Sequence, residues 1–331
     1  MTEEETKGII RKNELLAKGK ERKCFVDCCN SMTISSHLLQ KNGILNRISH
    51  QNHLYEIGIN PFNTPSFNFQ KIGINKALTF PGFCNKHDTE IFREIETKSI
   101  DFKDYRTNLL FSYRILVNEL RKKEILIDWY TENINNNELR THITPDYFYR
   151  LNESINGYKM ALNDGKYYLK YFNLDIYQNT KNFSFMTFEL PFIEICASGV
   201  FNYENSCEIV LMPESQPLTD IYFNLLPMDN KSIVIFGVLT EMKNKCWDYI
   251  EDFAKGSKVF SLKKVSDLLL TNVENWLCSK SVYEKLKSNE TVIVEEIKKT
   301  NQTNIERRTL DFNMFEYIDY KKNTFANTWY S

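Results

Sequence analysis

The sequence has no unbroken apolar run of about 18 residues, the length that a membrane-spanning helix needs. It starts with the acidic segment Met-Thr-Glu-Glu-Glu and has no apolar stretch of the secretory type there. Glycine (11 residues) and proline (8 residues) are too scarce for a collagen-like or low-complexity chain. The 42 Lys and Arg nearly balance the 43 Asp and Glu, which excludes a uniformly basic nucleic-acid coat. We therefore expect a cytoplasmic globular protein with no membrane partner.

Cysteine and histidine are unevenly distributed along the 331 residues. A chain of this length is expected to form two domains. Four of the eight Cys and four of the five His lie in the first 90 residues: Cys24, Cys28, Cys29, Cys84, His37, His50, His53 and His87. Residues 1–100 also carry 14 Lys and Arg against 11 Asp and Glu. We predict a mildly basic module over 1–100 and a second domain, of unassigned role, over 101–331.

Helical periodicity is clearest over residues 104–127, where Leu109, Tyr113, Leu116 and Leu120 repeat at intervals of three and four. The basic run Arg121–Lys123 on this helix is expected to face solvent. A charged helix is expected over 1–23 and a short one over 88–95, with Asp88 as its N-cap. Residues 131–144 are predicted to form a polar loop. A further helix is expected over 145–162, ending at Asn163-Asp164-Gly165.

Residues 166–240 change to strand-like apolar segments separated by turn residues, so an antiparallel sheet is expected there. The predicted strands are 167–172, 183–188, 208–211, 221–225 and 232–236. Helical patterns return over 243–299, with Val265, Leu268, Leu269 and Val273 forming one stripe. The fold class that follows is α+β, in which helices pack on an antiparallel sheet after a small N-terminal module.

Cys24-x4-Cys29 and Cys84-x2-His87 supply two ligand pairs from two separate turns, which is what a structural Cys3His zinc site requires. Cys28 is an alternative to Cys29 as the second ligand. Residues 24–90 are rich in Asn, Pro and Gly, and small modules of this kind often depend on a metal for folding. The competing interpretation is that these residues are ordinary reduced thiols.

His37 and Asp88 are the candidate catalytic residues. A histidine shortly after the first Cys pair suits a general base that activates water, and the alternatives are a loop hydrogen bond or a zinc ligand. Asp88 directly follows His87, and its carboxylate could help to hold a hard cation such as Mg²⁺. The other interpretation of Asp88 is the helix cap given above, and both roles can hold together.

Two segments resemble a group of uncharacterised bacterial proteins that pair a C…C…SH segment with a GFCxxHDxxxFxxIE segment. They are Cys29 to Ile48, with Ser36-His37, and Ile72 to Glu96, with Gly-Phe-Cys84-Asn-Lys-His87-Asp88. The order Cys, Cys, His, Cys-x2-His is in turn similar to the zinc-bearing branch of HNH endonucleases. That resemblance implies a treble-clef or ββα-metal core, with zinc on Cys24, Cys29, Cys84 and His87.

The same resemblance implies that His37 is the general base and that Asp88 binds Mg²⁺ or Mn²⁺. The chain departs from the HNH pattern at Ser36, where an acidic residue usually precedes the base, and no clear Asn occupies the middle position. Two hypotheses follow. One is a metal-dependent HNH-like endonuclease, a hydrolase acting on nucleic acid in bacterial defence. The alternative is a non-catalytic zinc-containing protein that binds or senses a protein or small-molecule partner.

Overall fold

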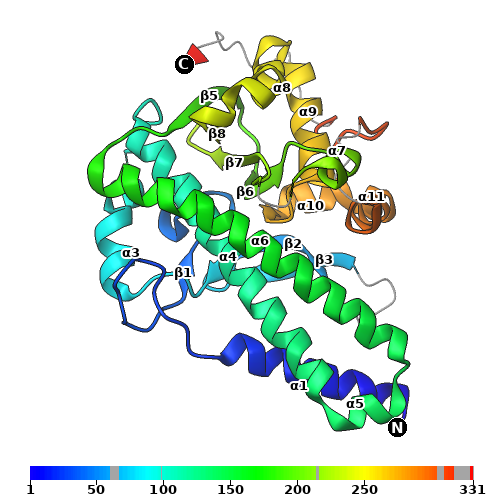
Figure 1. The fold of residues 1–331 in the computed structure, drawn as a ribbon. Helices are drawn as coiled ribbons and strands as arrows, with labels where there is room; N and C mark the ends of the chain where they lie inside the picture. Colours follow the sequence, from blue (N-terminus) through cyan, green and yellow to red (C-terminus); the bar gives the residue numbers. More distant parts are fainter. Residues whose placement is uncertain (60–66, 98, 214–215, 304–308, 317–328, 331) are drawn as a thin grey trace. The chain divides into compact units, whose positions relative to one another are not determined.

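The computed structural model describes residues 1–59, 67–97, 99–213, 216–303, 309–316 and 329–330. The chain forms two compact units, each assembled from several segments (Figure 1). The first unit comprises Met1–Ser36, Phe80–Glu90 and Leu116–Lys170, and the second comprises His37–Thr79, Ile91–Ile115 and Tyr171–Ser331. Two long helices, α4 (Tyr105–Asn135) and α6 (Pro145–Gln178), therefore contribute residues to both units.

The first unit contains α1 (Glu3–Gly19), α5 (Asn137–His142), the later part of α4 and most of α6. Thr2 caps α1 in a capping box with Glu5, which satisfies backbone amides that the first helical turn leaves without partners. The Trp129 indole donates to the carbonyl of Ile10 at 3.1 Å. A buried hydrogen bond of 2.9 Å joins Asn13 to Asn133. These polar contacts fix α1 along α4.

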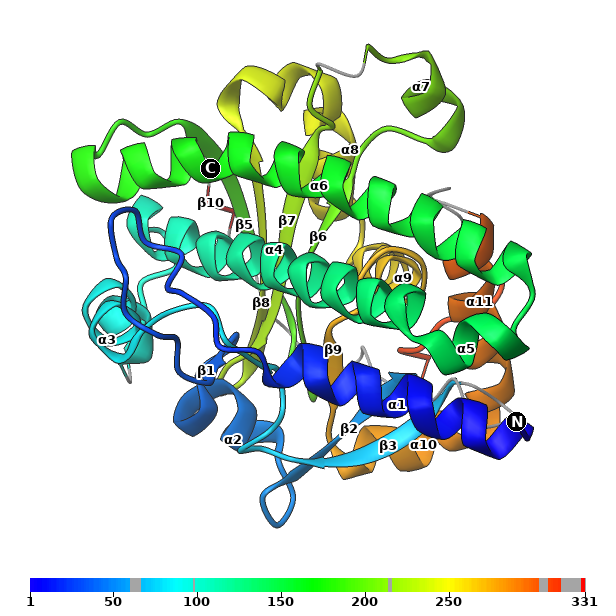
Figure 2. The ribbon, with the colours of Figure 1, turned by 60° about the horizontal axis from the view of Figure 1, so that its bottom comes forward.

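The second unit is built on an eight-stranded sheet whose order is β10-β5-β8-β7-β6-β9-β2-β3, with every pair antiparallel (Figure 2). Its strands are β2 (His53–Ile59), β3 (Phe67–Gly73), β5 (Phe183–Pro191), β6 (Ile195–Asn202), β7 (Asp220–Pro227), β8 (Lys231–Leu239), β9 (Trp276–Cys278) and β10 (Trp329–Tyr330). Neighbouring residues of a strand point to opposite faces. Phe236 accordingly packs against Phe253 of α8 (Lys243–Lys255) on one face. Tyr222 packs against Phe172 of α6 on the other face.

The remaining elements include several short turns and three further helices after α8. They are β1 (Ser36–His37), a π-helix at Lys41–Leu45, α2 (Asn46–Ile48), β4 (Thr79–Phe80), α3 (Asn85–Phe92), a 3-10 turn at Arg93–Glu96, α7 (Ser206–Leu211), a 3-10 turn at Thr240–Met242, α9 (Lys258–Thr271), α10 (Lys280–Leu286), a 3-10 turn at Lys287–Asn289 and α11 (Glu290–Thr303).

The mixed α+β class with an antiparallel sheet is what the sequence led us to expect. The helix predicted over 104–127 is present as α4 and is longer, and the predicted strands at 183–188, 221–225 and 232–236 lie within β5, β7 and β8. Three local predictions are wrong. Residues 167–172 are helical and belong to α6, residues 208–211 belong to α7, and residues 131–144 hold the end of α4 and all of α5.

The extension of α6 past Asn163-Asp164-Gly165 has a packing reason. A Cβ atom at Gly165 would lie 2.5 Å from Leu120 Cδ2, so glycine lets α6 approach α4 closely. Tyr168 and Phe172, four residues apart, are fully buried on one side of the helix. Burial of this side outweighs the turn-forming preference of the Asn-Asp-Gly sequence.

Candidate metal centre

The first half of the candidate metal centre is a closed loop in the first unit. The amide of Cys24 donates to Ser31 O at 3.0 Å, the amide of Thr33 donates to Arg22 O at 2.9 Å, and Lys23 and Met32 form a β-bridge. Inside the loop, the amide of Cys29 donates to Val26 O at 3.1 Å. These bonds turn the chain so that the Cys24 and Cys29 side chains can share one centre.

The second half is the turn from Phe80 into α3. Two hydrogen bonds attach this turn to the loop: the amide of Phe25 donates to Gly82 O at 3.1 Å, and the amide of Ile34 donates to Phe83 O at 2.8 Å. Cys84 directly precedes α3, and His87 lies in the first turn of that helix. Because residues three apart on a helix lie on the same side, Cys84 and His87 face the same centre.

The structure brings the ligand atoms of Cys24, Cys29, Cys84 and His87 within 4.8 Å of one another. His87 Nδ1 lies 3.4 Å from the sulfur atoms of both Cys24 and Cys84, and Cys29 Sγ lies 3.9 Å from Cys84 Sγ. A tetrahedral zinc ion with ordinary bond lengths places two sulfur ligands about 3.8 Å apart and a sulfur and a nitrogen about 3.5 Å apart. These distances fit such an ion, and the Cys3His group could hold a metal such as zinc.

Backbone amides donate hydrogen bonds to the sulfur atoms of Cys24 and Cys29. Burial raises the pKa of the Cys24 thiol to about 11, and hydrogen bonds from the amides of Val26 and Cys84 act in the opposite direction. A hydrogen bond from the backbone of Ser31 lowers the pKa of Cys29, which is more exposed. In both cysteines the amide two residues later donates to sulfur. Donors of this kind stabilise the thiolate, the form that binds a metal.

Arg121 of α4 contacts the loop that contains Cys24 and Cys29, although we expected it to face solvent. Its side chain is buried, and its guanidinium donates to Lys23 O at 2.7 Å and to Glu124 at 2.5 Å. The guanidinium carbon also lies 4.5 Å from the centre of the Phe25 ring. The spacing of basic residues gave no signal for this contact, because Phe25 and Lys23 lie about a hundred positions earlier in the chain.

The other predicted site residues lie outside the Cys3His group. Cys28 is exposed and has a positive φ of 63°, so the structure selects Cys29 as the second cysteine of the group. Asp88 is in the first turn of α3, but α3 begins at Asn85, so the prediction that Asp88 is the N-cap of a helix over 88–95 is wrong. Its amide donates to Cys84 O at 2.9 Å, as in a regular helix.

His37 belongs to the second unit and forms part of β1. Its Nε2 atom lies 3.0 Å from Ile74 O. In the described part of the chain, no second group of three or more Cys, His, Asp and Glu is close enough to hold a metal, so neither His37 nor Asp88 belongs to one.

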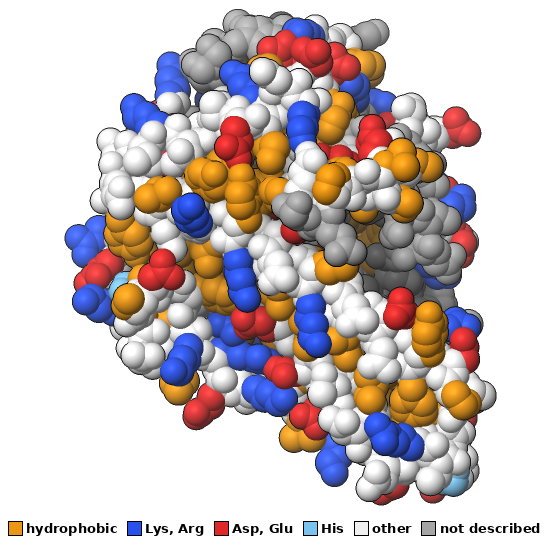
Figure 3. All heavy atoms as spheres, in the orientation of Figure 1, with side chains coloured by type: hydrophobic (Ala, Val, Ile, Leu, Met, Phe, Trp, Pro, Cys, Tyr) orange, Lys and Arg blue, Asp and Glu red, His pale blue; other side chains and the backbone are white. Residues whose placement is uncertain are grey.

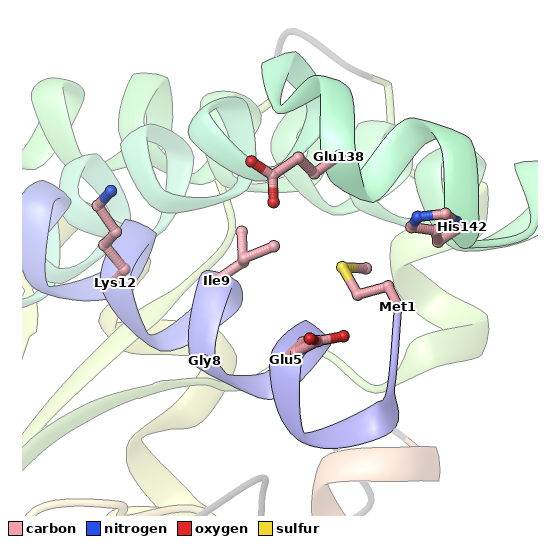
Figure 4. Close-up of a pocket in the computed structure, with 7 residues that line it drawn as sticks. All are labelled: Met1, Glu5, Gly8, Ile9, Lys12, Glu138 and His142. Atoms are coloured by element: carbon pink, nitrogen blue, oxygen red, sulfur yellow. The ribbon is translucent and has the colours of Figure 1, made fainter.

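A shallow hollow of about 480 Å³ lies between α1 and α5 in the first unit (Figure 4). Its charged side chains include Glu5, Lys12, Glu138 and His142, and all four are exposed. Glu5 is already engaged in the capping box of α1. Because exposed charges of both signs are the rule on protein surfaces, the hollow has no feature that selects a ligand.

No helix in the described residues is long and apolar enough to cross a membrane. Comparison with known proteins adds no relative: no family model, curated protein or solved structure matches this chain.

Proposed function

We propose that the first unit is a zinc-binding module in which Cys24, Cys29, Cys84 and His87 hold one structural zinc ion. The observation that carries this proposal is the mutual approach of four zinc-type ligand atoms to within 4.8 Å. The ligands come from two turns that are more than fifty residues apart in the chain. A metal bond between them would join two turns that are remote in the sequence.

Four protein ligands complete a tetrahedral zinc shell and leave no position for substrate or water. This coordination number favours a structural ion over a catalytic one. A catalytic zinc site keeps an open position, with three protein ligands. The amide hydrogen bonds to Cys24 and Cys29 support the same role, since they lower the energy of permanently deprotonated thiols.

Elemental analysis of the purified protein tests this proposal. We expect about one zinc per chain, and we expect Cys84→Ser to lose it. The matched control is Cys28→Ser, which removes an exposed thiol next to a ligand and should keep the zinc. Protein that contains no zinc after purification without chelator, and that does not take up added zinc, would contradict the proposal.

We further propose that the module belongs to a metal-dependent endonuclease of HNH-like type that acts in bacterial defence. The order of the ligands and the position of His37 in the sequence support this. The hydrogen bond from His37 Nε2 to Ile74 O is what the loop-bond alternative expects, and it is also compatible with a general base, because a donor at Nε2 leaves Nδ1 as the acceptor. Asp88 would help to hold Mg²⁺ or Mn²⁺, which would supply charge stabilisation to phosphodiester hydrolysis.

Cleavage assays on DNA and RNA with added Mg²⁺ or Mn²⁺ test the nuclease. We expect His37→Ala to abolish cleavage and to keep its zinc, and the exposed His50→Ala to retain both. Charges of both signs are interspersed on the face seen in Figure 3, so substrate binding would have to be local. Zinc-loaded protein that cuts no nucleic acid would instead support the non-catalytic alternative, a zinc-containing binding or sensor protein.

A further inference from the structure

The second unit contains a hollow of about 530 Å³ that is separate from the metal centre. Three segments line it: the π-helix with α2, the end of the 3-10 turn at Arg93–Glu96 with Thr97 and Ile100, and the turn between β7 and β8. Its volume is in the range of small-molecule sites. Its lining includes the partly exposed apolar side chains of Ile100 and Met228.

At the π-helix, the end of the Gln40 side chain lies against the backbone of Gly43. A Cβ atom at Gly43 would lie 1.8 Å from Gln40 Oε1. Gln40 is itself only 8% exposed, and its Nε2 donates to Thr97 O at 3.4 Å. The side-chain amide thus joins two of the three lining segments. Single π-helical turns are frequently found at functional sites, where they reposition side chains.

Arg47 and Glu96 both line the hollow, and each forms an ion pair, but the exposure of their partners differs. Arg47 pairs with Asp229 at 2.9 Å, but the Asp229 side chain is 89% exposed. A pair with such an exposed partner contributes little free energy, so another anion can replace the aspartate. Glu96 accepts from Arg114 at 2.5 Å, and the Arg114 side chain is only 2% exposed. Arg114 also stacks over the Phe92 ring at 4.1 Å, so this second pair is fixed.

We propose that this hollow binds a nucleoside monophosphate. Arg47 would take the phosphate in place of Asp229, because a guanidinium forms paired hydrogen bonds with phosphate oxygens. The base would lie against Ile100 and Met228. Glu96 would accept from the ribose hydroxyls. Its charge is already compensated by Arg114, so it suits a neutral hydroxyl donor better than the ammonium group of an amino acid. This inference does not depend on the zinc or nuclease proposals.

Calorimetric titration of the full chain tests the proposal, with the four common nucleoside 5′-monophosphates as separate probes. We expect at least one to bind with a dissociation constant below about 1 mM. Arg47→Gln should weaken that binding at least tenfold. Asp229→Asn should tighten it, because the competing carboxylate is gone. The control Arg150→Gln, which breaks an exposed ion pair on α6, should change nothing.

Four outcomes would overturn the proposal, and the first three concern the monophosphates. None of the four monophosphates binds; the nucleoside without its phosphate binds as tightly as the monophosphate; or Asp229→Asn weakens binding. Glutamate is the comparison ligand, and tighter binding of glutamate than of every monophosphate would assign the hollow to amino acids instead. If Arg47→Gln proves unfolded by circular dichroism, the Asp229→Asn result still decides, since that residue is exposed and loses only its charge.

Discussion

Replacement of Arg121 by alanine is the sharpest test of how the metal-binding loop is supported. Arg121 is 4% exposed and reaches from α4 to the backbone of Lys23, one residue before the first cysteine of the Cys3His group. Burial lowers the pKa of its guanidinium, and the neighbouring Glu124 carboxylate opposes that shift. Arg121→Ala therefore removes a buried charged donor without touching any of the four ligands.

The expected cost follows from the contacts that are lost. A hydrogen bond from a charged donor contributes about 1.5–3 kcal/mol, and the cation–π contact with Phe25 adds roughly 0.5–1 kcal/mol. The pair with Glu124 adds less, because that carboxylate is 33% exposed. The loop should thus open more easily by about 2–4 kcal/mol. At tenfold for each 1.4 kcal/mol, its amides should exchange at least about 30 times faster.

Hydrogen–deuterium exchange of peptides covering residues 22–34 measures this opening. Lys122→Ala is the matched control, since the Lys122 ammonium pairs at 3.0 Å with Glu119 on the partly exposed side of the same helix. We expect the control to leave the loop unchanged, and zinc content should be measured for both variants. Equal exchange rates in the two variants would refute the assigned role of Arg121.

Three further predictions concern the scaffold. Gly157→Ala should stabilise α6 by about 0.5–1 kcal/mol in urea unfolding, because a Cβ there meets no atom within 4 Å, whereas Gly165→Ala should lose this gain against Leu120. Burial raises the pKa of Glu56, so folding favours its protonated form. Glu56→Gln should therefore raise Tm at pH 7, and the difference in Tm should disappear below the ordinary pKa of glutamate. Asp175→Ala should cost about 3–5 kcal/mol, because this 1%-exposed carboxylate accepts from four donors, and a change under 1 kcal/mol in thermal unfolding would contradict this.

The sequence predicted best those elements whose apolar pattern agrees with their final burial. The stripe over 104–127 is such a case, since Leu109, Tyr113, Leu116 and Leu120 are all at most 2% exposed in α4. Predictions failed where long-range packing overrides local preference. Residues 167–172 have strand-forming aromatic side chains, yet they continue α6 because Tyr168 and Phe172 are buried from that helix. No local pattern carries that information.

The types and spacing of the metal ligands are properties of the sequence alone, because thiols and imidazole are what zinc prefers and each pair lies within one turn. The choice between Cys28 and Cys29 cannot be made from the sequence alone. It depends on which sulfur points inward after hydrogen bonds to Gly82 O and Phe83 O have joined the two turns, and these bonds connect residues far apart in the chain. The support from Arg121 and the hollow around Gly43 have the same origin. Composition and periodicity determine which side chains are available, whereas tertiary packing decides which of them meet, since only folding sets distances between remote residues.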